Sequence, residues 1–282
     1  MSSEGSFTMT FKGSNAFAAA LAFFGAFHDA GSASAAEPVL CTVVLAVETG
    51  NVLHQQGSCD YRAYPMSTFK LPLAMMGYDA GVLVDEKTPR WEYQQKFNAP
   101  KRVQKASDPT IWEAQSVVWY SQELTRRLGE KRFRDYVESF AYGNGDVSGG
   151  PGGTQGLTGS WLMSSLEISP NEQVDFLRRF LRGDLPISTH AVAMTQAITP
   201  RFDTKGGWTV HGKTGSGRMR DARGKADSGR PIGWFVGWAE KEGRRVVFAR
   251  LLVDAKPHEE PPISFVVRDT LIADLPEILR DN

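Results

Sequence analysis

The segments with β-strand character lie at the two ends of this chain, and the residues between them have mainly helical patterns. Near the N-terminus, "TVVLAVETGNVLHQQGS" holds two β-rich runs around a turn signal at Thr49-Gly50. Near the C-terminus, short aromatic or β-branched segments alternate with Gly- and charge-rich turns: "WTVHGKTGSG", "IGWFVGWAEKEG" and "RRVVFARLLVDA". We therefore predict a mixed α/β fold, in which the hairpin and the three later strands form one antiparallel sheet flanked by helices.

The helical patterns fill the middle of the chain and close its C-terminal end. The apolar "STFKLPLAMMGYDAG" predicts one helix, and further helices are expected over Trp112 to Leu128, Lys131 to Phe140, Asn171 to Leu181 and about Pro262 to Leu279. The Gly-rich "YGNGDVSGGPGGTQGLTGSW" is too long for a simple connector and is typical of a functional loop. We expect a single domain over residues 36–282, with a sheet part at about 36–66 and 185–282 and a mostly helical part at about 67–184.

Residues 1–35 have the order of an export signal. Lys12 precedes an Ala/Phe-rich stretch, Ala16 to Phe27, and the small residues "AGSASAA" follow, with cleavage expected after Ala35. The apolar stretch is too short for a permanent membrane anchor, so we predict a protein exported to the periplasm. Met9 is an alternative start, and a disordered or helical N-terminal extension is the competing interpretation.

Charge and histidine content exclude two classes of function. Lys+Arg and Asp+Glu both number 32, which lacks the basic footprint of a nucleic-acid binder and favours a small-molecule partner. The five histidines are scattered without helical metal-ligand spacing, so no metal site is predicted.

Two cysteines flank the predicted hairpin at equal sequence distance from Gly50. In that register, Cys41 and Cys59 lie opposite or nearly opposite each other, where Cβ separations approach the disulfide range. We predict a Cys41–Cys59 disulfide, which an oxidising compartment permits. Two buried free thiols are the alternative.

The first chemically distinctive motif is "STFK", at the start of the apolar helix. Ser67 and Lys70 are three residues apart and share one helix face, which places a nucleophile beside a base. The apolar neighbours of Lys70 favour its neutral form by desolvation.

Two further motifs follow along the chain. "SVV", Ser116 to Val118, lies at the head of a predicted helix. "KTG", Lys213 to Gly215, lies on a predicted strand, where the lysine can hold a substrate carboxylate and polarise a hydroxyl, and Gly215 leaves room for a ligand to approach the backbone.

Taken in order, these motifs resemble those of the class D serine β-lactamases, the oxacillinase group. The set comprises "STFK", "SVV", "YGN" at Tyr142 to Asn144, "WLMSSLEISPNEQVDFL" from Trp161, and "KTG" followed by "GWFVGW". The resemblance runs from the Cys41 strand to the terminal helix and implies the fold of the penicillin-recognising serine enzymes.

The resemblance implies that CO2 carboxylates Lys70 and that the resulting carbamate is the general base. No other cofactor is implied. Carbamate formation requires a neutral amine, and an apolar pocket of Phe69, Val118 and Leu162 would depress the pKa of Lys70. The Trp161 indole N–H would donate a hydrogen bond to the new anion.

The other site residues are also carried over from the family. Ser67 is the nucleophile, and its backbone N–H and that of Ser216 match the oxyanion hole. Ser116 relays a proton to the departing ring nitrogen beside Lys213. Tyr142 and Asn144 match motif positions and are interpreted as supporting residues, although a turn role for "YGNGD" is equally consistent.

The chain departs from the family where many members carry an arginine that binds the β-lactam carboxylate. The corresponding stretch here is "EEPPIS". Arg218 or Arg220 would substitute, or Lys213, Thr214 and Ser216 would suffice. Glu167 and Asn171 imitate a class A spacing, but the surrounding "SLEISPNEQV" fits class D, so we assign Glu167 a surface or capping role.

We therefore predict hydrolysis of β-lactam antibiotics through an acyl-enzyme on Ser67. The alternatives are a penicillin-binding transpeptidase or β-lactam sensor domain that acylates without efficient turnover, and a secreted binding protein that uses the same cleft. The sequence leaves open a monomer or a homodimer.

Overall fold

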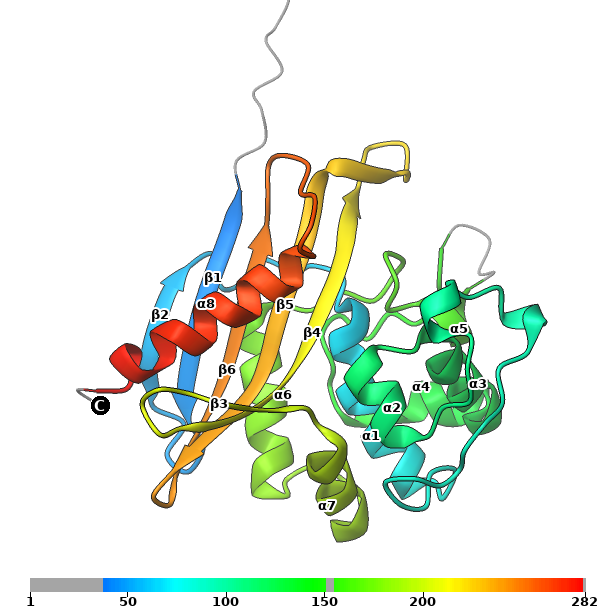
Figure 1. The fold of residues 1–282 in the computed structure, drawn as a ribbon, viewed down its shortest axis with the longest axis horizontal. Helices are drawn as coiled ribbons and strands as arrows, with labels where there is room; N and C mark the ends of the chain where they lie inside the picture. Colours follow the sequence, from blue (N-terminus) through cyan, green and yellow to red (C-terminus); the bar gives the residue numbers. More distant parts are fainter. Residues whose placement is uncertain (1–37, 151–154, 281–282) are drawn as a thin grey trace, which may run out of the picture. The chain divides into compact units, whose positions relative to one another are not determined.

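The computed structural model describes residues 38–150 and 155–280, so the predicted export signal lies outside the described residues. Its sheet is antiparallel throughout, with strand order β2-β1-β6-β5-β4-β3 (Figure 1). The strands are β1 (Val39–Ala46), β2 (Val52–Gly57), β3 (Arg201–Asp203), β4 (Thr209–Arg220), β5 (Ala226–Lys241) and β6 (Arg244–Val253). The predicted α/β fold with one antiparallel sheet is confirmed, and the short edge strand β3 was not predicted.

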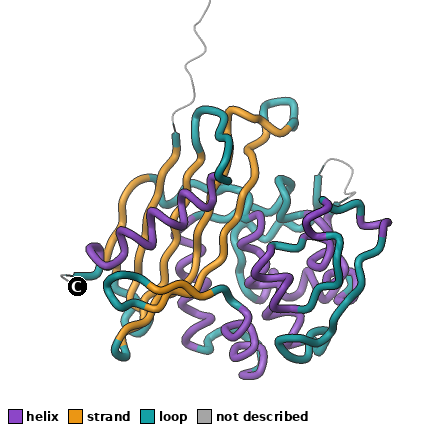
Figure 2. Tube along the Cα trace, viewed as in Figure 1, coloured by secondary structure: helices purple, strands orange, loops and turns teal. Residues whose placement is uncertain are grey.

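Helices cover the sheet and build the region beside it. They are α1 (Lys70–Asp79), α2 (Pro109–Gln115), α3 (Val118–Leu128), α4 (Glu130–Ser139), α5 (Gly156–Gly159), α6 (Pro170–Arg182), α7 (Thr189–Ile198) and α8 (Ile263–Ile278), with 3-10 turns η1 (Met66–Phe69), η2 (Gln95–Phe97) and η3 (Lys101–Val103). Figure 2 shows α8 crossing one face of the sheet and α6 behind the other face. No helix within residues 38–150 and 155–280 is both long and apolar enough to cross a membrane.

The central strand β5 separates two hydrophobic cores. Because side chains alternate along a strand, Trp234 and Val236 enter the large core shared with α1 and α6, whereas Phe235 packs with Leu271 of α8. This two-sided burial explains the nearly continuous apolar run "GWFVGW".

Helix α1 is buried from its first residue, Lys70, to Tyr78. A helix that is apolar on all sides has no face suited to water and becomes the centre of a domain. It packs against α3 and α7. The lysine at its start is therefore carried into the interior with it.

The hairpin register differs from the predicted one. Cys41 faces Gly57, and the ladder shifts between Val44 and Leu45. Gly57 has φ +84°, and the chain turns after it, so that Cys59 bonds to Cys41 with a Cα–Cα distance of 5.0 Å. The disulfide forms through this turn and not through directly opposed strand positions.

The expected helix from Trp112 to Leu128 is two helices. Asp108 caps α2 by accepting a hydrogen bond from the Ile111 amide, and α2 ends at Ser116, which has left-handed φ 54° and ψ 47°. Helix α3 then begins at Val118. The break turns Ser116 away from the helix axis and makes it available to a neighbouring strand.

Candidate active site

Ser67 lies in η1, which rests against strand β4. A Cβ at Gly215 would lie 2.9 Å from the Pro65 carbonyl oxygen and 3.1 Å from Thr68 Cγ2. The missing side chain of Gly215 therefore makes room for this turn of the chain itself. The close approach brings the Ser67 turn beside Lys213 and Thr214.

Lys70 is fully buried, and its Nζ lies 3.4 Å from Ser67 Oγ. Burial, reinforced by the nearby charge of Lys213, lowers the pKa of Lys70 to about 7. A large fraction of this amine is therefore neutral at neutral pH, which is the condition for a nucleophilic or basic lysine.

Ser116 and Lys213 meet across the break between α2 and α3. Lys213 Nζ donates to Ser116 Oγ at 2.5 Å and to the Thr214 carbonyl at 3.3 Å. Lys213 is 2% exposed, and this burial lowers its pKa. The hydroxyl of Ser116 thus lies directly against a buried amine, as the paired motifs predicted.

Three residues other than glycine in this region have left-handed backbone conformations. Met66, Ser116 and Met163 have φ of 54°, 54° and 51°. Such conformations are costly for residues with a side chain, and they persist where neighbouring contacts hold them. The Met66 amide donates to the Trp161 carbonyl at 3.0 Å, and Arg220 donates to the Met163 carbonyl.

Trp161 forms a buried wall behind Ser67. Its ring stacks on Phe69 with centroids 5.3 Å apart, and the side chain is 0% exposed. Among the described residues, the indole Nε1 has no hydrogen-bond partner. A buried N–H donor without an acceptor is rare and indicates a missing ligand or water.

We call Ser67, Lys70, Ser116, Trp161 and Lys213 the inner site. Leu162 and Val118, which were expected to line the lysine pocket, are partly buried; Leu162 follows Trp161 directly, and Val118 lies two residues after Ser116. Phe69 is completely buried between Trp161 and Tyr142.

Tyr142 lies in the core under the Ser67 turn. It is fully buried, its ring lies 5.2 Å from that of Phe69, and its hydroxyl is 3.5 Å from Gln173 Oε1. Gln173 Nε2 in turn donates to Thr68 Oγ1 at 3.1 Å. Tyr142 therefore supports η1 from below. Within the described part of the chain its hydroxyl forms no hydrogen bond with an inner-site residue.

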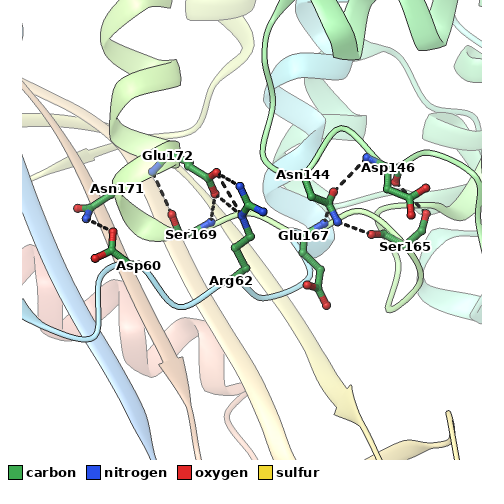
Figure 3. Close-up of polar contacts among 9 residues, drawn as sticks. All are labelled: Asp60, Arg62, Asn144, Asp146, Ser165, Glu167, Ser169, Asn171 and Glu172. Atoms are coloured by element: carbon green, nitrogen blue, oxygen red, sulfur yellow. Dashed lines mark hydrogen bonds and ion pairs between the residues drawn. The ribbon is translucent and has the colours of Figure 1, made fainter.

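Asn144 joins two loops, as Figure 3 shows. Its Nδ2 donates to the Ser165 carbonyl at 2.8 Å, and its Oδ1 accepts from the amides of Asp146 and Glu167. Gly143 beside it leaves no space for a Cβ, which would lie 2.1 Å from the Glu167 carbonyl oxygen. The "YGN" motif thus fixes the segment that carries Trp161 and also forms a turn.

Glu167 and Asn171 do not act together. In Figure 3 the Glu167 side chain points away from Asn171, whose Nδ2 donates to Asp60 at 2.8 Å. Glu172 forms the capping box with Ser169 at the start of α6. The capping alternative for Glu167 is therefore wrong; its half-buried carboxyl has a pKa raised mainly by burial.

A cavity of about 540 Å³ adjoins the inner site at the end of β4. It is lined by Met66, Met163, Ser216, Gly217, Arg218, Ser228, Pro231, Pro257, His258, Glu259, Glu260, Pro262 and Ile263. Concave sites of this size are where small ligands bind.

Polar side chains at the mouth of this cavity come from β4 and α8. Ser216 Oγ is hydrogen-bonded to Ser264 Oγ at 2.6 Å, and Arg218 is exposed. Arg220 donates to the carbonyls of Met163 and Gly224, so its guanidinium is already engaged. We call Ser216, Arg218 and Ser264, together with the cavity, the outer site. Ser264 was missed, although it stands in the "EEPPIS" stretch that lacks the expected arginine.

Glu113 is a second residue that the sequence analysis missed. It lies one turn before Ser116, is 0% exposed, and neither carboxylate oxygen has a hydrogen-bond partner among the described residues. Burial raises its pKa to about 7, while Lys213 and Lys70 act in the opposite direction. The only sequence signal was an acidic residue beside Trp112 in a segment that folds into the core.

Comparison with known proteins assigns the family. The penicillin binding protein transpeptidase domain model matches residues 40–264. Beta-lactamase OXA-9 of Klebsiella pneumoniae is 49% identical over 245 residues, covering 86% of this chain and 89% of that protein. The solved OXA-427 class D beta-lactamase superposes with a TM-score of 0.79 at 40% identity, over 86% of this chain and 99% of that one. The chain belongs to the class D β-lactamases.

A more distant class D relative, Beta-lactamase OXA-1 of Escherichia coli, is 35% identical over 202 residues, covering 70% of this chain and 69% of that protein. The resemblance inferred from the ordered motifs is confirmed.

Proposed function

We propose that this class D β-lactamase hydrolyses β-lactam antibiotics through an acyl-enzyme on Ser67, with carboxylated Lys70 as general base. The observation that carries the proposal is the 3.4 Å approach of a fully buried lysine amine to the Ser67 hydroxyl. An ordinary solvated lysine is almost wholly protonated at neutral pH and would be a poor base.

The residues around Lys70 fit a CO2 adduct. The pKa of its amine is lowered to about 7 by burial, and the unpartnered Trp161 N–H is a donor suited to a new buried anion. Bound to the Lys70 amine as a carbamate, CO2 would supply an anionic oxygen able to accept a proton from Ser67 and later from water. The lysine is 0% exposed, so bulk solvent does not reach its amine.

In the acylation step, Ser67 Oγ attacks the lactam carbonyl and the ring C–N bond breaks. The amides of Ser67 and Ser216 would hold the negative charge that develops on the carbonyl oxygen. Ser116 Oγ passes a proton to the departing nitrogen, and the Lys213 amine, 2.5 Å away, supports that transfer. Hydrolysis of the Ser67 ester then frees the enzyme.

The outer site would orient the substrate. We assign the β-lactam carboxylate to Thr214, Ser216 and Arg218, with Lys213 behind them, because Arg220 is engaged with two backbone carbonyls. Export to the periplasm through residues 1–35 belongs to the same proposal, since that compartment permits the Cys41–Cys59 disulfide.

Steady-state hydrolysis of a penicillin panel with and without added bicarbonate tests the proposal. We expect sustained turnover that degassing at mildly acidic pH lowers and bicarbonate restores. A single burst of ring opening without turnover would instead identify a transpeptidase or sensor, and failure of a penicillin to label Ser67 would leave only a binding function.

A further inference from the structure

Glu113 places a carboxylate inside the protein without a hydrogen-bond donor. Both of its oxygens are buried and unpartnered within the described part of the chain, and Trp112 and Val117 around it are 0% exposed. A buried ionised carboxylate is costly unless a charge of opposite sign lies near it. A carboxylate at this position therefore requires positively charged groups near it.

Those charges belong to the inner site. Lys213 on β4 is the strongest electrostatic neighbour of Glu113, and Lys70 on α1 is the next. Tyr78 on α1 also faces Glu113, and Arg102 of η3 acts on Lys70. The pocket thus encloses two amines and one carboxyl, and Arg102, which donates to the Gln115 carbonyl, lies at its edge.

We propose that CO2 capture at Lys70 is coupled to protonation of Glu113, which makes Glu113 a positioning residue that controls how tightly the enzyme holds CO2. The inference rests on the proposed carboxylation of Lys70. It concerns a residue outside the motifs that identified the family, and it follows from a buried, unpartnered carboxyl group that lies one turn before Ser116, the residue to which Lys213 donates.

The chemical balance explains the coupling. A bond forms between Lys70 Nζ and the carbon of CO2, and the Lys70 ammonium gives up two protons, one to the Glu113 carboxylate and one to solvent. Before the step the pocket holds two ammonium groups and one carboxylate; after it the pocket holds one ammonium, one carbamate and a neutral carboxyl. The carbamate and an ionised Glu113 are therefore never present together in the buried pocket, where their repulsion would be strong.

This balance predicts that ionised Glu113 opposes CO2 binding. The carboxylate stabilises the ammonium form of Lys70, which cannot react, and repels the carbamate once it forms. The pKa of about 7 for Glu113 places its protonation in the range where Lys70 also titrates. Removing the charge should therefore tighten CO2 binding, whereas damage to the fold would weaken it.

The test compares the parent protein with Glu113→Gln and Glu113→Leu, two uncharged side chains of similar size. The carbamate carbon is followed by 13C NMR while dissolved [13C]CO2 is varied at fixed pH. At about pH 8, where Glu113 of the parent is ionised, each variant should reach half-saturation at about tenfold lower CO2, which corresponds to one pKa unit of repulsion between the Glu113 carboxylate and the carbamate. Below about pH 6 the difference between parent and variants should disappear, because Glu113 of the parent is then already protonated.

Glu167→Gln is the matched control, because Glu167 is also a partly buried glutamate with a raised pKa but faces Arg62 and not the two amines. Its half-saturation should equal that of the parent. If the parent shows the carbamate signal and both Glu113 variants bind CO2 equally or more weakly, the inference is overturned and the role of Lys70 stands. If the parent shows no signal under saturating CO2, the proposed base is wrong and the inference falls with it.

Discussion

The inner and outer sites are adjacent but differ in their exposure to water. In the inner site Lys70 and Trp161 are 0% exposed and Lys213 is 2% exposed. In the outer site Ser216 and Arg218 are exposed, and the lining of its cavity includes His258 and Glu259 from the segment before α8. The reacting groups and the groups that first meet the substrate therefore work in different media.

This difference in exposure predicts which property of the enzyme a substitution at each site would change. Charges interact strongly in the dry inner site, so a single proton or hydrogen bond there decides the state of Lys70. Exposed charges in the outer site are screened by water and salt, so each contributes little alone. Chemistry should depend on the inner site and substrate affinity on the outer one.

Lys70→Ala should produce the largest effect. Loss of the base should lower turnover by about 10³ to 10⁴-fold and leave Ser67 acylated, because ester hydrolysis has no group to activate water. Mass spectrometry of a penicillin-treated sample should show the trapped adduct. Lys87→Ala, at an exposed lysine, is the control and should hydrolyse penicillin normally. Sustained turnover by Lys70→Ala would show that the chemical step does not depend on the inner-site lysine.

A fall in pH should inactivate the inner site before it affects the outer site. The folded-state pKa of Lys70 is lowered to about 7, so the reactive neutral amine predominates above that pH and is lost as the pH falls through it. Turnover should fall about tenfold per pH unit below this value in CO2-depleted buffer. Added bicarbonate should offset the loss, and a pH profile indifferent to bicarbonate would contradict carboxylation.

Trp161→Phe should have an intermediate effect. Phenylalanine can keep the stacking on Phe69 but has no N–H, so the bicarbonate needed for half-maximal activity should rise about tenfold, the equivalent of one buried hydrogen bond. Trp112→Phe is the matched control, because its indole donates to Ser121 at 2.8 Å. An equal response of both variants would show that Trp161 acts through packing alone.

Arg218→Ala should produce the smallest effect and only in binding. We expect KM for penicillins to rise about twofold to fivefold with kcat unchanged, since an exposed cation contributes about 1 kcal/mol or less. Arg223→Ala, on the exposed turn after β4, should leave both constants unchanged. A fall in kcat for Arg218→Ala would show that a residue at the cavity mouth also contributes to the chemical step.

Sequence patterns predicted most of the sheet because strand segments and helical segments differ in period. They also predicted α1 and the lysine buried with it, since a helix without a polar face must be internal. The start of a helix after Ser116 was predicted from "SVV", but the separate helix α2 before it was not, because a single left-handed serine leaves no propensity signal.

The remaining errors came from long-range geometry. The cysteines were expected opposite or nearly opposite each other in the hairpin, but the ladder shifts at Val44/Leu45 and Cys41 faces Gly57, so that Cys59 lies two residues beyond the facing position. Ser264 and Glu113 were overlooked because a serine on a helix start and a glutamate beside a tryptophan acquire meaning only through what lies opposite them. The periodicity of a sequence carries no information about a partner that is distant along the chain.

The left-handed conformations of Met66, Ser116 and Met163 set a limit for protein engineering. Each costs about 1–3 kcal/mol relative to an ordinary backbone conformation. A glycine at Met66 would relieve that cost but would also empty a buried position of the core. A glycine at Ser116 would relieve it by removing the hydroxyl that Lys213 contacts, so heat resistance gained there would be accompanied by loss of turnover.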